Sequence, residues 1–464
     1  MHSWIVDHLK THFDTIQVHL GNDESLRVSA LAAAKLKGDV EVSFGLVSSN
    51  AAADSLPCVV ISIETEDTGD IQTRIRAGAQ NEAQFCLSAR SEDWQAFFTS
   101  NEKLVRPYQS FWGMLRVLGP QHKEVCAIGD TTAFARYARV WRISLDRIRD
   151  AVNEVPILQP GTATVMAEHE DTEEDSVVGR YTCINHSEYG KVKIFYEMAG
   201  HGPEVLVFLH TAGSDSRQYH SLMNNKTLQE QCTMIAFDLP AHGRSSLGTK
   251  QYPESYALTE ESYIESIDLF LQKLKMRNVV LCGASMAGHI CIAAAIRAQE
   301  LSVRGVIPCE GCAHLPFSQP IYEIRGNDSS ILDPERVCGM IAPTSPEYYK
   351  QQIWWQYSSQ GAGVFSGDLK FYFKGWDGRG RVENIDTETC PVYMLTGEYD
   401  YSCTVEASKE TAAMIKGAVF EEMKGLGHFP LTENPTAVLP YLMRAIDHIQ
   451  AHWHNKKSVA NDMG

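Results

Sequence analysis

One serine lies in a setting that suits a nucleophile. The segment "VVLCGASMAGHICIAAA" (279–295) passes from an apolar stretch through a tight turn at Ser285 into an alanine-rich stretch. The residues two before and two after the serine, Gly283 and Ala287, are both small. Small neighbours let a strand turn sharply into a helix while the hydroxyl stands clear, above the positive end of that helix. The pattern predicts that Ser285 is a catalytic nucleophile.

A serine hydroxyl needs a base to remove its proton, and near neutral pH the usual base is an imidazole. Of the seventeen histidines, His428 has the most suitable context. It lies in "EEMKGLGHFPLTENP", between a glycine-rich turn and Pro430, just after a short apolar stretch late in the chain. We therefore expect His428 to be the general base.

The imidazole in turn needs an acid that fixes its tautomer and stabilises its cation. In "VYMLTGEYDYSCT", Asp400 follows an apolar stretch and is the favoured candidate. Glu398 in the same loop and Glu310 at the end of "VRGVIPCE" are the alternatives.

A tetrahedral intermediate also requires backbone N–H donors directed at its oxyanion. The residue after the nucleophile, Met286, is expected to supply one donor. The small residues of "HTAGSDSRQYH" (210–220) allow the main chain to approach a substrate, and Ala212 is the expected second donor, with its register open by one residue. His210 is expected to hold this loop by hydrogen bonds.

The elements that must position these residues alternate along the chain. Short apolar stretches, separated mostly by helix-like segments, predict strands at 191–199, 204–210, 232–240, 278–285, 303–310, 390–398 and 418–425. Such alternation is typical of an α/β fold with a mostly parallel sheet flanked by helices, and ligands of such sheets bind at the carboxyl ends of the strands.

The first 152 residues have a different pattern. Strands are expected at 40–46, 58–64 and 83–89, and helical spacing of apolar residues extends over 131–152. These features predict a smaller α+β N-terminal domain (1–152). An acidic, Pro-Gly-containing stretch, 153–178, is expected to be a linker.

Five ordered motifs resemble the α/β-hydrolase superfamily: "FLHTAGSDSRQYH", "FDLPAHGRSS", "GASMAG", "LTGEYD" and "GLGHFP". The resemblance implies an α/β-hydrolase domain over 179–456, with the serine, acid and histidine in the family's order. Two departures are "HTAG" where His-Gly is usual and Ala287 where the elbow usually has glycine. They leave open the oxyanion geometry and the subfamily.

The resemblance also implies a helical cap in the long insertion at about 313–388. This insertion is rich in aromatic residues, and four of them are candidates for the substrate pocket: Trp354, Trp355, Tyr357 and Phe371. The N-terminal domain resembles sterol-carrier-protein-2-like domains through the order of its strands and "LSARSEDWQAFF". Such a domain could supply an apolar ligand cavity or could pair two subunits as a homodimer.

Composition limits the partners. The formal net charge of −17 disfavours nucleic acid and anionic membranes as partners. The sequence has no run of about 18 apolar residues, so no membrane span is expected. With no signal-peptide pattern, a cytoplasmic protein with a small-molecule substrate is expected. Most of the twelve cysteines are expected to be buried free thiols. The one Cys-x-x-Cys, Cys309 and Cys312, lacks a second pair, so no metal or organic cofactor is expected.

The favoured function is a serine hydrolase acting on an ester, lactone or thioester of a bulky, largely apolar or aromatic, even polyketide-derived, substrate. One alternative is a carbon–carbon bond hydrolase that uses the same three residues on a diketone. The other is a non-catalytic ligand receptor or carrier with this fold.

Overall fold

The computed structural model describes residues 3–37, 41–48, 56–157, 175–252, 256–315, 334–361 and 363–462. The chain divides into two compact units, one that contains the described residues up to Ile157 and one that contains the described residues from Asp175 on. We call them the N-terminal unit and the C-terminal unit. Most of the predicted acidic linker lies outside the described residues. Among the helices described, none is both long enough and apolar enough to cross a membrane.

The N-terminal unit is α+β, as predicted. Its five-stranded sheet has the order β3-β2-β1-β4-β5. The strands are β1 (Glu41–Ser48), β2 (Pro57–Thr65), β3 (Ile71–Ala79), β4 (Phe85–Ala89) and β5 (Cys126–Gly129). The helices are α1 (Trp4–Lys10), α2 (Phe13–Gly21), α3 (Glu24–Lys37), α4 (Ser91–Phe97), α5 (Phe111–Val117), α6 (Thr131–Arg136) and α7 (Ala138–Val152).

Aromatic side chains fill the core of this unit. Trp94, Phe111 and Trp141 are buried and stack on one another or on neighbouring rings. Helix α7 contributes a strongly amphipathic face to this core, because its apolar residues recur at helical spacing. The aromatic residues of this region therefore pack against each other, and the likeness to sterol-carrier-protein-2-like domains stays a prediction.

The C-terminal unit contains an eight-stranded, mostly parallel sheet with the order β13-β12-β11-β10-β8-β9-β7-β6. The pairs from β13 to β9 are parallel, whereas β7 pairs antiparallel with both β9 and β6. The strands are β6 (Val178–His186), β7 (Gly190–Ala199), β8 (Glu204–Leu209), β9 (Cys232–Phe237), β10 (Val279–Ala284), β11 (Val303–Cys309), β12 (Tyr393–Gly397) and β13 (Val419–Met423). The predicted α/β fold with a mostly parallel sheet is confirmed.

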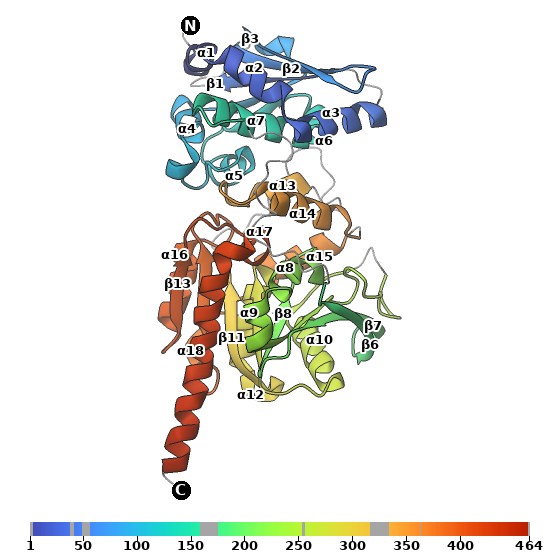
Figure 1. Ribbon diagram of the computed structural model, residues 1–464, viewed down its shortest axis with the longest axis vertical. Helices are drawn as coiled ribbons and strands as arrows, with labels where there is room; N and C mark the ends of the chain where they lie inside the picture. Colours follow the sequence, from blue (N-terminus) through green and yellow to red (C-terminus); the bar gives the residue numbers. More distant parts are fainter. Residues whose placement is uncertain are drawn as a thin grey trace. The chain divides into compact units, whose positions relative to one another are not determined.

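Helices cover both faces of this sheet. On one face, α8 (His220–Met223), α9 (Lys226–Gln231) and α18 (Pro435–Asp462) share a core with alternate residues of β8, Leu206 and Phe208. Figure 1 shows α18 running along the sheet. On the other face lie α10 (Glu260–Lys273), α11 (Met286–Ile296) and α16 (Val405–Met414); Phe270 of α10 stacks on Phe237 of β9. Burial on both faces explains why these strands are almost uniformly apolar.

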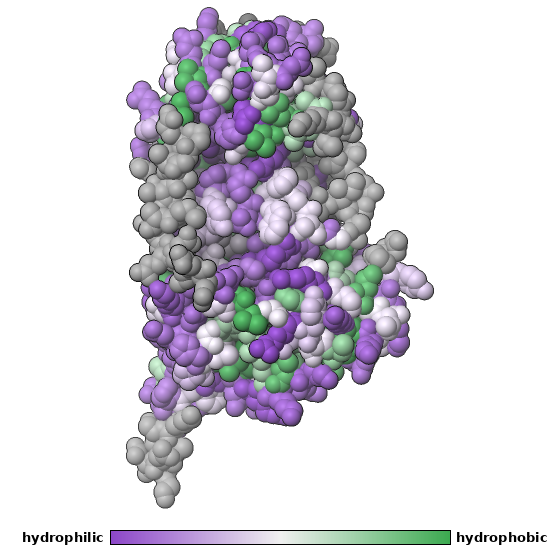
Figure 2. Space-filling view, turned by 45° about the vertical axis from the view of Figure 1, so that its right-hand side comes forward, coloured by the Kyte–Doolittle hydropathy of each residue, from purple (hydrophilic) through white to green (hydrophobic). Residues whose placement is uncertain are grey.

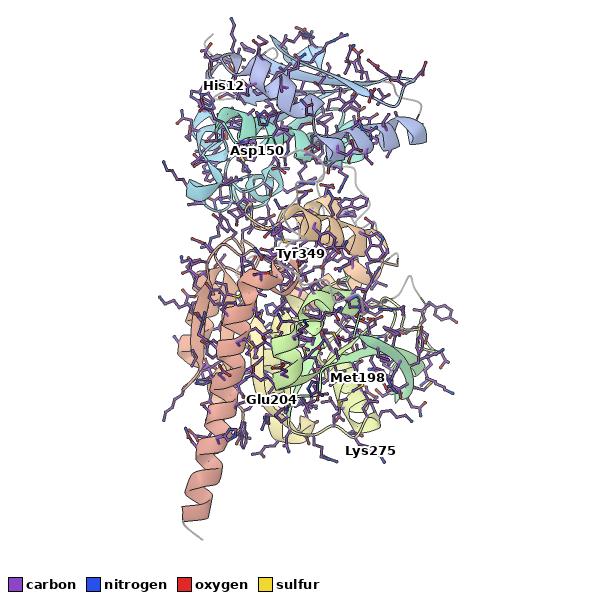
Figure 3. The ribbon with its side chains drawn as sticks, in the orientation of Figure 1. His12, Asp150, Met198, Glu204, Lys275 and Tyr349 are labelled. Carbon is purple, nitrogen blue, oxygen red and sulfur yellow. The ribbon has the colours of Figure 1, made fainter. Side chains whose placement is uncertain are left out.

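An insertion separates β11 from β12. Its described helices are α13 (Pro334–Cys338), α14 (Glu347–Ser358), α15 (Val364–Lys370), the one-turn π-helix η7 (Phe371–Gly375) and the 3₁₀ helix η8 (Val382–Asn384). Residues 316–333 of the predicted cap lie outside the described residues. In Figure 3, Tyr349 of α14 lies toward one end of the C-terminal unit. Glu204, the first residue of β8, and Lys275, in the connection that precedes β10, lie toward the other. The insertion is therefore at the carboxyl edge of the sheet.

The face of the molecule seen in Figure 2 is mostly hydrophilic, with apolar side chains in small scattered groups. This surface agrees with the acidic composition, since charged side chains are rarely buried unless they are paired.

Candidate active site

Ser285 stands at the sharp turn between β10 and α11. Its backbone has φ 62° and ψ −122°, a conformation that L-residues adopt at a cost in energy. The turn is held in place because the N–H of Ser285 donates to the carbonyl of Cys309 at 3.1 Å, and its carbonyl accepts from His289 N at 3.1 Å. Strain that the surroundings hold in this way is common where a side chain must be presented for chemistry.

The small residues around the turn are required by contacts. A Cβ built on Gly283 would lie 2.5 Å from the Cβ of Ala287 and 2.7 Å from the carbonyl oxygen of Leu209. A Cβ on Gly288 would lie 2.1 Å from the carbonyl oxygen of Cys309. Gly288, one position later than the second glycine of the usual pattern, is therefore needed where α11 packs closely on the end of β11. Ala287 still fits beside the turn.

Substitution of Gly283 by alanine should lower stability, because the new methyl group meets a backbone oxygen and a buried methyl that cannot move away freely. We expect a loss of about 1–3 kcal/mol, seen as a lower melting temperature of the full chain. The matched control is Gly361→Ala, where the nearest atom to the new Cβ is 3.4 Å away. That variant should stay within about 0.5 kcal/mol of the wild type. Equal melting temperatures for the two variants would contradict the steric argument.

The three residues of the predicted triad form one hydrogen-bonded chain. Nε2 of His428 lies 2.9 Å from Oγ of Ser285, and Nδ1 of His428 lies 2.8 Å from Oδ2 of Asp400. The three side chains come from the turn after β10, the loop after β12 and the loop after β13. All three are buried, with exposed fractions of 3% for Ser285, 3% for His428 and 0% for Asp400.

Asp400 is held as a carboxylate. Burial raises the pKa of its carboxyl group, but the charge and hydrogen bond of His428, a hydrogen bond from Glu310 and the N–H of Ser402 outweigh burial, so the pKa lies below its usual value. The N–H of Ser402 donates to Oδ1 at 2.7 Å, which leaves Oδ2 for the histidine. The geometry orients the imidazole with Nδ1–H toward the acid and Nε2 toward the serine.

The two alternative acids lie in other settings. Glu398 is 39% exposed and pairs with Lys424 at 3.4 Å. Glu310 is fully buried and accepts a hydrogen bond from Gly397 N at 2.9 Å. Burial, together with the charge and hydrogen bond of Asp400, raises the pKa of Glu310 well above its usual range. Glu310 is thus favoured as a neutral acid that donates to Asp400.

A further acid, Glu433, holds the histidine loop, and the sequence analysis did not single it out. Its carboxyl accepts from the N–H groups on either side of His428, Gly427 N at 2.5 Å and Phe429 N at 3.3 Å. It also accepts from Ala342 N at 3.3 Å in the insertion. Glu433 is fully buried and begins no recognisable motif, so only its contacts identify this role.

The two predicted backbone donors are Met286, directly after Ser285, and Ala212 in the loop after β8. Met286 is the first residue of α11, and N–H groups in the first turn of a helix have no acceptor within it. In the loop after β8, Thr211 N donates to Gln218 at 2.8 Å and Gly213 N donates to Asp368 at 2.7 Å. Ala212 N, between them, has no protein acceptor among the described residues. Within this stretch, Ala212 is therefore the residue with an available N–H.

Asp368, in α15 of the insertion, ties this loop to the rest of the site, although no motif in the sequence marks it. Besides Gly213 N, its carboxylate accepts from His242 Nε2 at 2.8 Å and from the hydroxyl of Tyr256 at 3.0 Å. Nδ1 of His242 donates to the carbonyl of Pro240, so both ring nitrogens act as donors. Burial lowers the pKa of His242, but Asp368 raises it by more. The result is a buried ion pair behind the loop.

His210 holds the same loop, as predicted from sequence, and it does so as a neutral ring. Its Nδ1 donates to the carbonyl of Thr211 at 2.9 Å and its Nε2 accepts from Leu239 N at 3.1 Å. Burial and the neighbouring charge of His242 lower the pKa of His210 to about 4.

This low value predicts a pH dependence of stability. Between pH 6.5 and about 4 the unfolded chain protonates His210 whereas the folded chain does not, so stability is present above pH 6.5 and is lost as the pH falls through this window. The contribution is at most about 3 kcal/mol. Thermal unfolding across pH 4–7 should therefore show a shallower slope for His210→Gln than for the wild type. The control is His454→Gln on the exposed surface of α18. A slope unchanged by His210→Gln would contradict the assignment.

The predicted pocket residues lie in different places. The hydroxyl of Tyr357 hydrogen-bonds with Oγ1 of Thr211, and its ring contacts Phe429 at 5.7 Å, so Tyr357 borders the loop after β8. Trp354 is partly buried and packs on the cluster that contains Tyr357 and Phe429.

Trp355 is on the outer face of α14, where it is 52% exposed and stacks under Arg217. Phe371 is fully buried against Tyr263 of α10. Contrary to expectation, the structure does not bring Trp355 to the site.

Three other aromatic residues lie nearer the chemistry. Phe429 contacts the ring of His428 at 5.0 Å, and Tyr372 approaches it at 6.3 Å. Phe365 covers Gly213: a Cβ there would lie 2.5 Å from its ring, and the φ of +63° also favours glycine. Phe365 and Tyr372 belong to the insertion, whose richness in aromatic residues was visible in the sequence, but which of its rings face the loop depends on helix rotation.

Comparisons with known proteins agree with this fold. A model of the alpha/beta hydrolase family matches residues 206–440, and the chain belongs to this family. An uncharacterized hydrolase of Bacillus subtilis, YugF, is 21% identical over 278 residues, which cover 54% of this chain and 93% of the relative.

Two solved structures are similar to this chain. The structure of a thermophilic esterase from Thermogutta terrifontis, with malate bound, is 20% identical with a TM-score of 0.50 and covers 58% of this chain and 99% of its own. An enol-lactonase from Burkholderia xenovorans is 16% identical with a TM-score of 0.47 and covers 59% of this chain and 100% of its own. At this identity the esterase shows the fold alone.

Proposed function

We propose that this chain is a serine hydrolase that cleaves carboxylic esters, including lactones and thioesters, with a largely apolar or aromatic acyl group. The observation that carries the proposal is the chain of hydrogen bonds from Asp400 through His428 to Ser285, with the serine on a strained turn at the start of a helix. Membership of the alpha/beta hydrolase family supports it.

In the first half of the reaction, Nε2 of His428 takes the proton of Ser285 as its Oγ attacks the substrate carbonyl carbon. The carboxylate of Asp400 stabilises the imidazolium that forms. It already accepts a hydrogen bond from Nδ1–H of His428, and this bond fixes the tautomer of the ring. His428 then gives the proton to the departing alcohol or thiol, which leaves an acyl-enzyme on Ser285.

The negative oxygen of the tetrahedral intermediate needs donors that are already in place. Met286 N–H and Ala212 N–H are the two we propose for this oxyanion hole, because the neighbouring N–H groups of Thr211 and Gly213 are engaged elsewhere. In the second half, His428 removes a proton from a water molecule that attacks the acyl carbon. Collapse of the second intermediate restores Ser285 and releases the acid.

Aromatic side chains beside the loop after β8 and beside His428 support an apolar or aromatic acyl group. The hydroxyl of Tyr357 hydrogen-bonds with Thr211, Phe365 packs over Gly213, and the rings of Phe429 and Tyr372 contact the ring of His428. We propose that the insertion forms a cap and that these rings line the acyl pocket beneath it. Burial of such surface favours binding by about 25 cal/mol per Å² of apolar area, so larger acyl groups should bind more tightly until they no longer fit.

The test is labelling of the full chain with a fluorophosphonate probe, followed by peptide mapping, and a panel of esters, lactones, thioesters and one diketone. We expect the adduct on Ser285 and turnover of esters that have aromatic or long acyl groups ahead of acetyl esters. Turnover of the diketone alone would show that the protein cleaves a carbon–carbon bond and not an ester bond. A folded protein with neither an adduct nor turnover would overturn the proposal in favour of a ligand carrier.

A further inference from the structure

Three buried side chains with metal-binding atoms converge beside the site. They are His289 in α11, Cys312 in the loop after β11 and Cys403 in the loop after β12. Each has an exposed fraction of 0%, and their ligand atoms all lie within 4.8 Å of one another. The hydrolytic mechanism uses none of the three.

The arrangement is specific. Nε2 of His289 lies 3.7 Å from Sγ of Cys312. The His289 ring stacks on Tyr372 with centroids 4.7 Å apart, and its Nδ1 has no hydrogen-bond partner in the part of the chain that is described. The ring is therefore oriented by stacking and by the sulfur it faces. Around it, Trp376 Nε1 donates to the carbonyl of Cys312, and Sγ of Cys403 lies 3.5 Å from Oγ of Ser408.

These separations suit a metal ion. Zinc binds thiolate sulfur at about 2.3 Å and imidazole nitrogen at about 2.0–2.1 Å, which places neighbouring ligand atoms about 3.5–4 Å apart. The 3.7 Å between His289 and Cys312 falls in that range. A cation at the centre would also need no large movement of the backbone, because the three ligand atoms already lie within 4.8 Å of one another.

Charge selects the type of cation. A buried site that keeps a net charge is costly. Two thiolates and a neutral imidazole carry −2, which a divalent cation neutralises and a monovalent one does not. Sulfur and imidazole ligands together favour zinc over magnesium or calcium, which prefer oxygen. We propose that His289, Cys312 and Cys403 bind one Zn²⁺.

Binding at this site releases two protons, one from each thiol, and involves no oxidation or reduction. Zinc held by three protein ligands takes a fourth from solvent. The ion would fasten three elements together: the helix that begins after Ser285, the loop after β11 and the loop that carries Asp400. His289 is one helical turn from Ser285, and Cys403 is three residues from Asp400.

The spatial cluster also reassigns the Cys-x-x-Cys motif. Cys309 is not part of the cluster, and its Sγ lies 3.8 Å from the carbonyl of Ile307 within β11. Cys312 instead finds its partners on two elements that are distant in sequence. Cys309→Ser is therefore a matched control: it alters the same motif and another fully buried thiol without removing a proposed ligand.

The test is the metal content of the full chain, expressed with zinc, purified without a histidine tag and washed with EDTA to remove surface zinc. We expect about one zinc per chain in the wild type and in Cys309→Ser, and a fall of at least about tenfold in Cys312→Ser and Cys403→Ser. Wild-type chain expressed with cobalt should show a thiolate-to-cobalt charge-transfer band. This band reports cysteine ligands in the wild type, so the proposal stays testable even if a cysteine variant fails to fold.

Three outcomes would overturn the proposal. The first is wild-type chain without zinc after the wash and without the cobalt band. The second is zinc retained by both Cys312→Ser and Cys403→Ser. The third is a disulfide between Cys312 and Cys403 in most molecules on a non-reducing peptide map, since sulfurs bonded to each other are not zinc ligands. If Cys309→Ser misfolds, Cys390→Ser, a second buried cysteine outside the cluster, replaces it.

Discussion

Ser285→Ala should abolish labelling by a fluorophosphonate and should lower kcat for ester hydrolysis by about 10⁶-fold, because only the oxyanion donors and substrate binding would remain. KM should change little, since the hydroxyl contributes mainly to the transition state. The side chain is 3% exposed and its Oγ contacts the imidazole. Replacing it by a methyl group should therefore leave the fold in place.

The matched control is Ser266→Ala, another buried serine. Its hydroxyl donates within α10 to the carbonyl of Ser262, away from the chemistry. This variant should keep the activity and labelling of the wild type. Hydrolysis by Ser285→Ala at a rate near the wild type would show that the serine is not the nucleophile. Saturable binding of an ester without turnover, by the wild type and by Ser285→Ala alike, would instead favour a receptor.

Asp400→Asn should lower kcat/KM by about 10³–10⁴-fold, because an amide can present its N–H to Nδ1 of His428 and so hold the wrong tautomer. Nε2 would then carry a hydrogen toward Ser285 and could not accept one. The pH–rate profile of kcat/KM, measured on the same ester for each variant, checks this result. Folding of the variant is verified by its melting temperature.

Two conservative changes separate the competing acids. Glu310→Gln should stay within about tenfold of the wild type, because a glutamine amide imitates a protonated acid that accepts from Gly397 N and donates to Asp400. Glu398→Gln should have a smaller effect still, because that carboxylate pairs with Lys424 at the surface. A large loss in Glu310→Gln together with little loss in Asp400→Asn would exchange the roles of the two acids.

Much of the C-terminal sheet could be predicted from the sequence, because its strands are buried on both faces and read as apolar runs between turns. Strand β6 was missed for the opposite reason. It is the edge strand, and its side chains from Val178 to Tyr181 are exposed. In the N-terminal unit, β3 is likewise an edge strand with exposed residues such as Arg74 and Arg76. Edge strands need fewer apolar residues and so give a weaker signal.

The residues of the candidate site also differ in how far the sequence could predict them. Ser285, Asp400 and His428 could be found because each follows a predicted parallel strand, and those strand ends meet at one edge of the sheet. Asp368 could not be found, because its partner Gly213 N is 155 residues away in sequence. Nothing in the local pattern around Asp368 marks that contact. Residues that act through tertiary hydrogen bonds are visible only once the chain is folded.

The contact between Asp368 and Gly213 N restricts how the substrate range of this protein could be altered. A chimera that received the whole insertion from another family member would lose the acceptor of that N–H and the counter-ion of His242 together. The freed N–H could then compete with Ala212 for the oxyanion, and a buried imidazolium would lack its partner. Useful grafts would therefore keep α15 with its aspartate, and also Tyr357 of α14, whose hydroxyl hydrogen-bonds with Thr211 in the same loop.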